Sequence, residues 1–355
     1  MTQPFTFESA IPRIVFGIGS ISKVSEELGR LGRGRALVLS TPHQENDAQA
    51  LASALGELAV GVFNRAVMHT PVDVTTEALS MFNGSGADCI VSLGGGSTIG
   101  LGKAIALRNN APQLVVATTY AGSEVTPILG ETENGIKTTI RTSSVLPKTV
   151  IYDPELTFGL PVPMSVTSGL NAMAHAVEGL YAQDRNPIAS LMAMEGLAAL
   201  RKALPAIVNL PRDPLARTDA LYGSWLCGVV LGAVGMSLHH KLCHTLGGTF
   251  DLPHAETHAI LLPHTVSYIE QAVPELLAPV ARLFGAPRAG TGLHDFALSI
   301  GAPMRLRDLG VTGDDLDRAT ALAVSHPYWS PRPLEAGGIR ALLQNAWQGV
   351  RPHLR

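Results

Sequence analysis

The first half of the chain alternates short apolar runs with longer segments that have helical spacing. Between residue 34 and about residue 155, five short runs rich in β-branched residues recur, separated by segments such as VDVTTEALSMFNGSG. Strands that alternate with helices are typical of a parallel sheet built from βαβ units. We therefore predict an α/β domain in this half. The expected strands are ALVLS, VGVFN, DCIVSLGGG, LVVATTY and TVIYD.

The second half shows apolar residues at helical spacing and little strand patterning. Its apolar segments include SGLNAMAHAVEGLYA, PIASLMAMEGLAALRKAL and DALYGSWLCGVVLGAVGMSL, so we expect an all-α domain. The prolines and the glycine of DPELTFGLPVP mark irregular backbone between the two patterns. The predicted domains are therefore residues 1–155 and 156–355, and we expect cofactor and substrate to meet at the cleft between them.

Composition and charge restrict the class of protein. A chain of 355 residues with 46% hydrophobic residues favours about two domains. The net charge is only -3 and the basic residues are scattered, which argues against nucleic acid or a membrane surface as a partner. Cys89, Cys227 and Cys243 are too far apart for a disulfide framework or a zinc knuckle. We find no signal peptide and no run of about 18 uncharged apolar residues, so we expect a cytoplasmic protein.

A glycine-rich turn follows one of the predicted strands. Gly94, Gly95, Gly96 and Ser97 lie between an apolar strand and a helical segment. Glycines let backbone N–H groups approach phosphate oxygens, and the N-terminus of the following helix adds a partial positive charge of about half a unit. Lys103, two helical turns further on, can reach a ribose or a phosphate. A tight turn without a ligand remains the alternative interpretation.

A second polar loop, ATTYAGSEVTP, also follows an apolar strand. It offers the hydroxyls of Thr118, Thr119 and Ser123 beside a glycine. Two such loops at neighbouring strand ends suit a dinucleotide. The earlier FGIGS segment is a weaker signal because it lacks the full GxGxxG pattern.

The end of the ALVLS strand bears on the choice between NADH and NADPH. An NAD-specific site often has an acidic residue here, but this chain has Ser40, Thr41 and Pro42. No carboxylate therefore repels a 2′-phosphate. We expect NADPH to be accepted beside NADH, and we place Thr41 in the cofactor site.

Histidines gather in one part of the second half. Five of the twelve fall within LHHKLCHTLGGTFDLPHAETHAILLP. His240 and His244 are four residues apart, so they share one face of a helix, about 6 Å apart along its axis. After a glycine pair, a turn can return His254 to the same point, and Asn171 and His175 repeat the four-residue spacing on an earlier helix. These residues can form a cage for a substrate or a metal. The five histidines are His239, His240, His244, His254 and His258, with His264 just beyond.

Each histidine on its own is equally compatible with a buried structural or a surface imidazole. Glu178, three residues after His175, is expected either to support the cage or to form a salt bridge along its helix.

Several segments together resemble the iron-containing alcohol dehydrogenases, whose relatives include glycerol dehydrogenase and dehydroquinate synthase. The segments are GGGS with Lys103, TTYAGSEVT, DPELT, LNAMAHAVE and HHKLCHTLGGTFDLPHAETHAILLPH, and they cover most of the chain. The resemblance implies a Rossmann-like NAD(P)-binding domain and a helical domain that holds a metal with one Asp and two or three His. By motif position, these ligands correspond to Asn171, His175, His240 and His254. His244 matches a further histidine near the nicotinamide and the substrate.

Three departures from the family pattern refine this resemblance. Asn171 replaces the metal-binding Asp, which removes the one anionic ligand and weakens the site for a hard divalent cation. Gly100 takes the place of a second Asp, and the TTYAGSEVT loop is one residue short. With the LHHKLCH and PYWSPRP strings, these departures resemble the maleylacetate reductase branch, which is thought to work without a metal. This implies NADH or NADPH as cofactor, no bound metal, and a small dicarboxylate substrate.

The implied reaction transfers a hydride to an alkene that is conjugated with a ketone, and forms 3-oxoadipate. Negative charge moves to the ketone oxygen, so the site needs preorganised hydrogen-bond donors or positive charge. We assign His244 and His240 as hypothetical enolate stabiliser and proton donor. Lys241 is the candidate for a substrate carboxylate, although a solvated helix lysine is equally compatible, and Arg332 is a second candidate. Asn171, His175 and His254 complete the expected catalytic group.

Other functions need features that the sequence shows only in part. A metal-dependent alcohol or polyol dehydrogenase needs Asp at position 171. A lyase similar to dehydroquinate synthase needs a richer basic pocket, and a non-catalytic binding protein would have degraded cofactor loops. The apolar segment LYGSWLCGVVLGAVGMSL suits either the core or the contact of a homodimer, which is the expected assembly.

Overall fold

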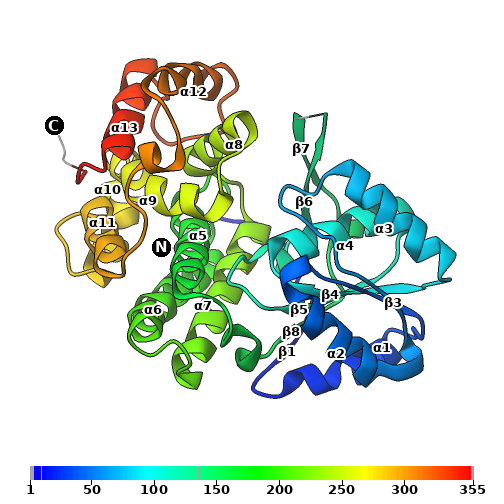
Figure 1. Cartoon of the computed structure of the whole chain (residues 1–355). Helices are drawn as coiled ribbons and strands as arrows, with labels where there is room; N and C mark the ends of the chain where they lie inside the picture. Colours follow the sequence, from blue (N-terminus) through cyan, green and yellow to red (C-terminus); the bar gives the residue numbers. More distant parts are fainter. Residues whose placement is uncertain (1–3, 9, 135, 353–355) are drawn as a thin grey trace. The chain divides into compact units, whose positions relative to one another are not determined.

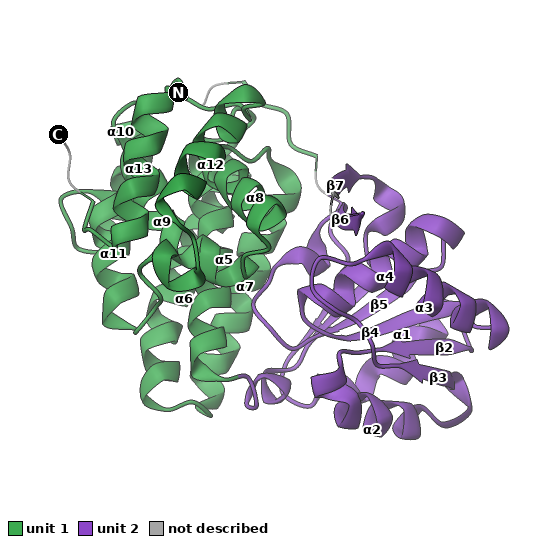
Figure 2. Ribbon diagram, turned by 45° about the horizontal axis from the view of Figure 1, so that its top comes forward, with its two compact units in different colours: residues 1–8, 161–355 green, residues 9–160 purple. Residues whose placement is uncertain are grey.

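The computed structural model describes residues 4–8, 10–134 and 136–352, and the chain forms two compact units (Figures 1 and 2). An α/β unit and a helical unit divide between residues 160 and 161, five residues after the expected boundary at 155. Residues 4–8 group with the helical unit and not, as expected, with the α/β unit.

The α/β unit is built on a six-stranded parallel sheet with the order β1-β8-β5-β4-β2-β3. All five expected strands are present, as β2, β3, β4, β5 and β8, and β1 is an additional edge strand. The predicted parallel α/β architecture is confirmed. The strands are β1 (Arg13–Phe16), β2 (Ala36–Leu39), β3 (Ala59–Phe63), β4 (Cys89–Gly94), β5 (Gln113–Ala117) and β8 (Thr149–Tyr152).

Helices cover both faces of this sheet (Figure 1). Along β2, Ala36 and Val38 face a core that includes residues of α1 and α2, whereas Leu37 and Leu39 face a core that includes residues of α3 and α4. A strand buried on both faces has a continuous apolar sequence, and the ALVL run has this character. The covering helices are α1 (Val24–Arg30), α2 (Glu45–Leu55), α3 (Val72–Gly84) and α4 (Gly96–Asn109).

Two further strands form a separate antiparallel hairpin, β6 (Ile128–Glu133) and β7 (Ile136–Arg141). The sequence analysis did not predict it. The hairpin lies between β5 and β8 along the chain, directly after the polar loop that follows β5.

The helical unit confirms the predicted all-α domain over the described part of its chain. The segment DALYGSWLCGVVLGAVGMSL forms most of α7 and then leaves the helix, and only its last residue begins α8; the two helices are bent by 95°. The backbone N–H of Gly235 donates to the carboxylate of Asp184 at this break, at 2.9 and 3.2 Å to its two oxygens. The helices are α5 (Val162–Tyr181), α6 (Pro187–Asn209), α7 (Pro214–Ala233), α8 (Leu238–Phe250), α9 (His254–Glu270), α10 (Pro274–Leu283), α11 (Ala289–Ser299), α12 (Gly313–Ser325) and α13 (Ala336–Gln348).

By length and hydropathy, no single helix within the described residues can cross a membrane, and only the bent pair α7–α8 meets the length and composition criteria together.

Two glycines let α6 and α7 approach closely. A Cβ atom on Gly223 would lie 2.9 Å from the carbonyl oxygen of Gly196, and one on Gly196 would lie 3.0 Å from the carbonyl oxygen of Gly223. Both helices also contact α5, which carries Asn171 and His175. This close crossing therefore supports the helix on which part of the site is built.

We predict that Gly223→Ala lowers the free energy of unfolding of the helical unit by about 1 to 3 kcal/mol, because a backbone carbonyl cannot move aside as a flexible side chain can. Gly337→Ala on α13 is the control, since its Cβ would have no neighbour within 4 Å. It should be neutral or stabilising by up to about 1 kcal/mol. Urea unfolding followed by circular dichroism measures both variants, and equal stabilities would contradict the prediction.

Candidate functional site

Three segments of the α/β unit meet at the carboxyl edge of its sheet. Thr41 follows β2, residues 94–97 join β4 to α4, and residues 118–123 follow β5. The strand order places β4 between β2 and β5. Parallel strands end at a common edge, where open α/β sheets bind their ligands at the point at which the strand order reverses. Here that reversal lies between β2 and β4.

Hydrogen bonds connect these three segments. The side-chain amide of Gln44 donates to the Thr118 hydroxyl at 3.0 Å, which links the segment after β2 to the loop after β5. The backbone N–H of Thr118 donates to the carbonyl of Gly94 at 3.1 Å, which links that loop to the glycine turn. The structure thus brings together the segments that the sequence nominated for the cofactor.

Only one of the three glycines in the turn has open space where a Cβ atom would lie. Gly94 has a φ of +152°, and a Cβ atom on it would lie 2.5 Å from the Thr98 hydroxyl. A Cβ atom on Gly95 would lie 2.7 Å from the side chain of Thr119, whereas one on Gly96 would have no neighbour within 4 Å. The N-cap residue of α4 makes no side-chain capping bond, so the first N–H groups of α4 keep donors for an anion.

Lys103 is buried on α4, and its ammonium points into the loop after β5. It donates to the carbonyls of Ser123, Thr126 and Ile128 at 2.6, 2.8 and 2.8 Å. Burial lowers the pKa of Lys103 to about 7, against the opposing charge of Glu124. The sequence suggested that Lys103 reaches a ribose or a phosphate. In the structure its donors are used by the loop, so Lys103 joins α4 to that loop.

A second group of site residues lies in the helical unit, where α5, α8 and α9 bring imidazoles together. The ring centre of His240 lies 5.2 Å from that of His175, 5.0 Å from His258 and 5.9 Å from His244. The ring of His254 packs against His258, with centres 4.3 Å apart. The nominated histidines of three helices are therefore neighbours.

The turn that brings α9 back differs from the expected one. The glycine pair at 247 and 248 lies inside α8, which continues to Phe250. The chain turns instead at Asp251, which has a positive φ of 53°.

Four buried polar atoms in this group have no hydrogen-bond partner among the described residues. They are Asn171 Oδ1, His175 Nδ1, His240 Nε2 and His258 Nε2. Burying such atoms unpaired costs free energy, so their gathering on three helices indicates a ligand-binding site.

The same atoms bear on metal binding. Zn–N bonds of about 2.0–2.1 Å at tetrahedral angles put imidazole centres about 5 Å apart, near the separations of His240 from His175 and His258. The site therefore fits a borderline-soft cation better than a hard one, which needs anionic oxygen ligands. A second possible ligand group is formed by His239, Cys243 and His258, whose ligand atoms lie within 4.8 Å of one another.

A buried carboxylate, Glu178, orients the histidines of α8. His240 Nδ1 contacts one of its oxygens, and the backbone N–H of His239 donates to the other at 2.8 Å. Tyr181 donates its hydroxyl to the carboxylate at 3.3 Å. Burial raises the pKa of Glu178, but His240 and the other donors outweigh it, and the pKa lies below its ordinary value. Glu178 is thus an ionised group that supports the cage rather than a partner in a salt bridge along its own helix.

Two more of the expected site residues, His244 and Lys241, lie near Tyr328. His244 Nδ1 is 3.1 Å from the Tyr328 hydroxyl, and the Lys241 ammonium is 5.6 Å from the centre of the Tyr328 ring. Partial burial lowers the pKa of Lys241. Arg332, the second candidate for a substrate carboxylate, instead stacks on the Tyr268 ring at 3.7 Å and donates to the Tyr268 carbonyl at 2.9 Å. Its guanidinium therefore packs the chain after α12 against α9.

Sequence reasoning did not assign His239, His258 or Tyr328 to the site. The four-residue spacings of His239 to Cys243 and of His254 to His258 were available as signals. Tyr328 was visible only as part of the PYWSPRP string.

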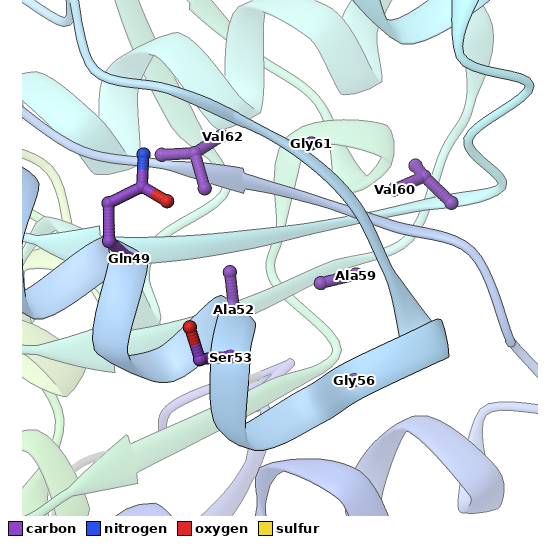
Figure 3. Close-up of a pocket in the computed structure, with 8 residues that line it drawn as sticks. All are labelled: Gln49, Ala52, Ser53, Gly56, Ala59, Val60, Gly61 and Val62. Atoms are coloured by element: carbon purple, nitrogen blue, oxygen red, sulfur yellow. The ribbon is translucent and has the colours of Figure 1, made fainter.

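A surface hollow of about 420 Å³ lies elsewhere, between α2 and β3 (Figure 3). None of its lining side chains ionises and none was nominated from the sequence, so it is not a candidate for the chemistry. The lining residues are Gln49, Ala52, Ser53, Gly56, Ala59, Val60, Gly61 and Val62.

Comparison with known proteins supports both halves of this description. Residues 12–154 match the family model for iron-containing alcohol dehydrogenase, and residues 165–347 match the C-terminal model of the same family. The chain is 67% identical over 350 residues to a maleylacetate reductase of Rhizobium sp. (strain MTP-10005), covering 99% of both chains. It is 54% identical to one of Burkholderia cepacia, covering 98% of this chain and 99% of the relative. The crystal structure of maleylacetate reductase from Agrobacterium tumefaciens matches with a TM-score of 0.95 at 65% identity, covering 99% of this chain and all of that one.

The buried histidines make the stability of the helical unit depend on pH. Burial lowers the pKa of His239 and of His264 from 6.5 to about 3. The unfolded chain therefore binds more protons than the folded one between these values, and the free energy of unfolding falls as the pH drops through this window. Each histidine contributes at most about 1.4 kcal/mol per pH unit.

We predict that His264→Asn makes this pH dependence shallower. Urea unfolding at pH 7, 6 and 5 measures it, with the exposed His326→Asn as control. The same slope in the wild type and in the His264 variant would contradict the prediction.

Proposed function

This chain belongs to the iron-containing alcohol dehydrogenase family, and we propose that it reduces maleylacetate to 3-oxoadipate with NADH or NADPH as the hydride donor. The observation that carries the proposal is the full-length similarity to maleylacetate reductases. The group of histidines on α5, α8 and α9 gives this reaction a suitable chemical environment.

The cofactor is proposed to bind at the carboxyl edge of the sheet. The free N–H groups at the start of α4 and the open position at Gly96 suit a pyrophosphate. The hydroxyls of Thr118, Thr119 and Ser123 and the backbone of residues 94–97 are the proposed contacts. Thr41 follows β2 without a carboxylate beside it, which is the reason to expect that both NADH and NADPH are used.

The reaction needs one hydride and one proton. A bound nicotinamide would supply the hydride. When the alkene carbon β to the ketone gains this hydride, the electron pair of the double bond moves to form an enolate. A proton then adds to the α-carbon, the other carbon of the former double bond, and the ketone is restored. The protein must therefore stabilise an oxyanion and deliver a proton.

His240 is suited to this proton transfer. Its Nδ1 is held by the Glu178 carboxylate, so its Nε2 is the atom directed away from that pair. When His240 is protonated, the neighbouring carboxylate balances its charge, and after Nε2 has given up the proton the Nδ1 hydrogen bond remains. Glu178 positions His240 but does not itself touch the substrate in this proposal.

His244 and Tyr328 are suited to hold the enolate oxygen. Their hydrogen bond of 3.1 Å fixes the imidazole and the hydroxyl relative to each other. Lys241, close to the same tyrosine ring, is the proposed partner of a substrate carboxylate. Asn171, His175 and His254 complete the proposed catalytic group.

We propose that this reaction is independent of a metal. Asn171, His175 and His240 can hold a cation, which when bound would polarise the ketone oxygen. The amide of Asn171, however, provides no negative charge to retain it. The unpaired ligand atoms of these residues favour, as a second candidate, a metal-dependent alcohol or polyol dehydrogenase.

The test is the oxidation of NADH and of NADPH in the presence of maleylacetate, with enzyme as purified and enzyme treated with a strong chelator. We expect equal turnover before and after chelation, and turnover with both nucleotides. Activity that is lost to the chelator and restored by Zn²⁺ or Fe²⁺, or that appears only with alcohols and NAD⁺, would instead establish the second candidate.

We predict that His244→Ala lowers kcat by about 10²- to 10⁴-fold, the range expected for loss of a positioned donor. The KM for NADH should stay within about twofold, since His244 is assigned to the enolate and not to the nucleotide. Steady-state kinetics measures both constants. His326→Ala is the matched control, because His326 is an exposed histidine. An unaltered kcat in the His244 variant would remove this residue from the mechanism.

A further inference from the structure

A chain of hydrogen bonds behind the histidine group begins at Thr265 on α9. The Thr265 hydroxyl oxygen lies 3.0 Å from the carbonyl oxygens of both Leu261 and Leu262. The hydroxyl has one proton, and a bond from it to these carbonyls, which can only accept, leaves its oxygen as an acceptor toward His239. The remaining lone pair of Thr265 faces His239, whose Nδ1 lies 3.0 Å away.

This bond determines the tautomer of His239. Since Thr265 accepts, His239 Nδ1 carries the proton and donates it. Both imidazoles are fully buried, and their ring nitrogens contact Thr265 and each other rather than a carboxylate, so each ring is neutral and carries one proton. His239 Nε2 therefore has a lone pair.

The same reasoning extends to His258. Its Nδ1 lies 2.9 Å from His239 Nε2, so Nδ1 donates its proton to that lone pair. His258 Nε2 then keeps a lone pair of its own. This atom is buried and has no hydrogen-bond partner among the described residues. The ring of His258 is a neighbour of His240 and His175, at 5.0 and 6.3 Å between ring centres.

We propose that His258 is a specificity-determining residue of this site, and that Thr265 and His239 are positioning residues that fix its tautomer with the lone pair on Nε2. This part of the site accepts a hydrogen bond or binds a cation, and it repels carboxylate and enolate oxygens. It has the opposite polarity to His240, whose Nε2 donates when the imidazole is protonated.

Cys243 does not change this assignment. Its sulfur lies 3.6 Å from His239 Nε2, the nitrogen that already accepts from His258. A metal bound to His239, Cys243 and His258 would have to replace that proton. The hydrogen bonds account for the arrangement of these three residues without a metal ion.

The consequence for specificity rests on the proposed function. Maleylacetate carries two carboxylates and a ketone, and each of these groups offers only acceptor oxygens. Next to His258 Nε2 they would meet a lone pair, so the substrate is oriented with its oxygens toward His240, His244 and Lys241. Thr265 thus determines substrate orientation through two histidines and without contact to the substrate.

The first test measures the tautomer in the wild-type holoprotein. Enzyme labelled with ¹⁵N-histidine is examined by long-range ¹H–¹⁵N correlation NMR, and His258→Gln identifies the His258 signals by their loss. We expect a pyridine-like Nε2 and a pyrrole-like Nδ1 for His258. The reverse pattern would overturn the proposal, and this test needs only the assignment variant His258→Gln to fold.

The second test reverses the direction of the hydrogen bonds from Thr265 to His258. Thr265→Val keeps the shape of the side chain but removes the acceptor, so a proton on His239 Nδ1 would be buried without a partner. We expect His239 to move its proton to Nε2 and His258 to move its own to Nε2, which makes that nitrogen pyrrole-like. Thr265→Ser is the matched control, because its hydroxyl keeps the acceptor, and it should retain the wild-type spectrum.

The same change of tautomer should also alter the kinetics of the enzyme. We expect Thr265→Val to lower kcat with maleylacetate by about tenfold or more, the effect of losing a partner that orients an active imidazole, and Thr265→Ser to restore it. An unchanged His258 tautomer in the valine variant, or a changed tautomer with unchanged kcat, would overturn the role of Thr265. Because NMR needs no substrate, failure of the maleylacetate reaction would overturn the proposed function and leave the tautomer result to stand by itself.

Discussion

The helical site depends on one buried negative charge, the carboxylate of Glu178. A charge inside a protein is stable only when hydrogen-bond donors and an opposite charge surround it. Glu178 meets this need with the side chain of His240, the backbone of His239 and the hydroxyl of Tyr181, so a residue of α5 fixes the first turn of α8. This bond also decides which nitrogen of His240 is free. The Glu178 carboxylate therefore determines both the separation between α5 and α8 and the chemistry of the imidazole between them.

The cofactor region of the α/β unit depends on geometry rather than on charge. A parallel sheet collects the ends of β2, β4 and β5 at one edge, whatever loops follow them. The chain uses this edge for glycines and hydroxyls, and it uses Lys103 to tie the loop after β5 to α4. The buried ammonium of Lys103 donates to carbonyls of that loop, so different positions of α4 have different roles. The first turn of α4 has the backbone N–H groups that we propose for the cofactor, while a side chain later in the helix holds the neighbouring loop.

The sequence could predict those features that neighbouring residues encode, and it could not predict those that depend on contacts between distant residues. The strands β2, β4 and β5 are buried on both faces, so their apolar runs were clear, whereas β1 is a four-residue edge strand with exposed ends and the β6–β7 hairpin has a mostly polar sequence. At the break between α7 and α8, Gly235 binds Asp184, which is about 50 residues away along the chain, and a contact of this range has no signal in the local sequence. His240 and Glu178 were visible through helical spacing. His258 was not assigned, because its role depends on His239 and Thr265, and the direction of a hydrogen-bond chain has no periodicity in sequence.

Charge balance explains why Asn171 suits this particular site. Glu178 is the carboxylate that contacts the histidine group, and burial keeps His175, His239 and His258 neutral. One proton on His240 is then enough to neutralise Glu178. A carboxylate at position 171 would add a second negative charge beside the same imidazoles, and a single proton would no longer balance the site, whereas a divalent cation would. The amide keeps an oxygen at this position without adding that charge. Under the proposed metal-independent reaction, Asn171 would therefore suit a site that transfers a proton.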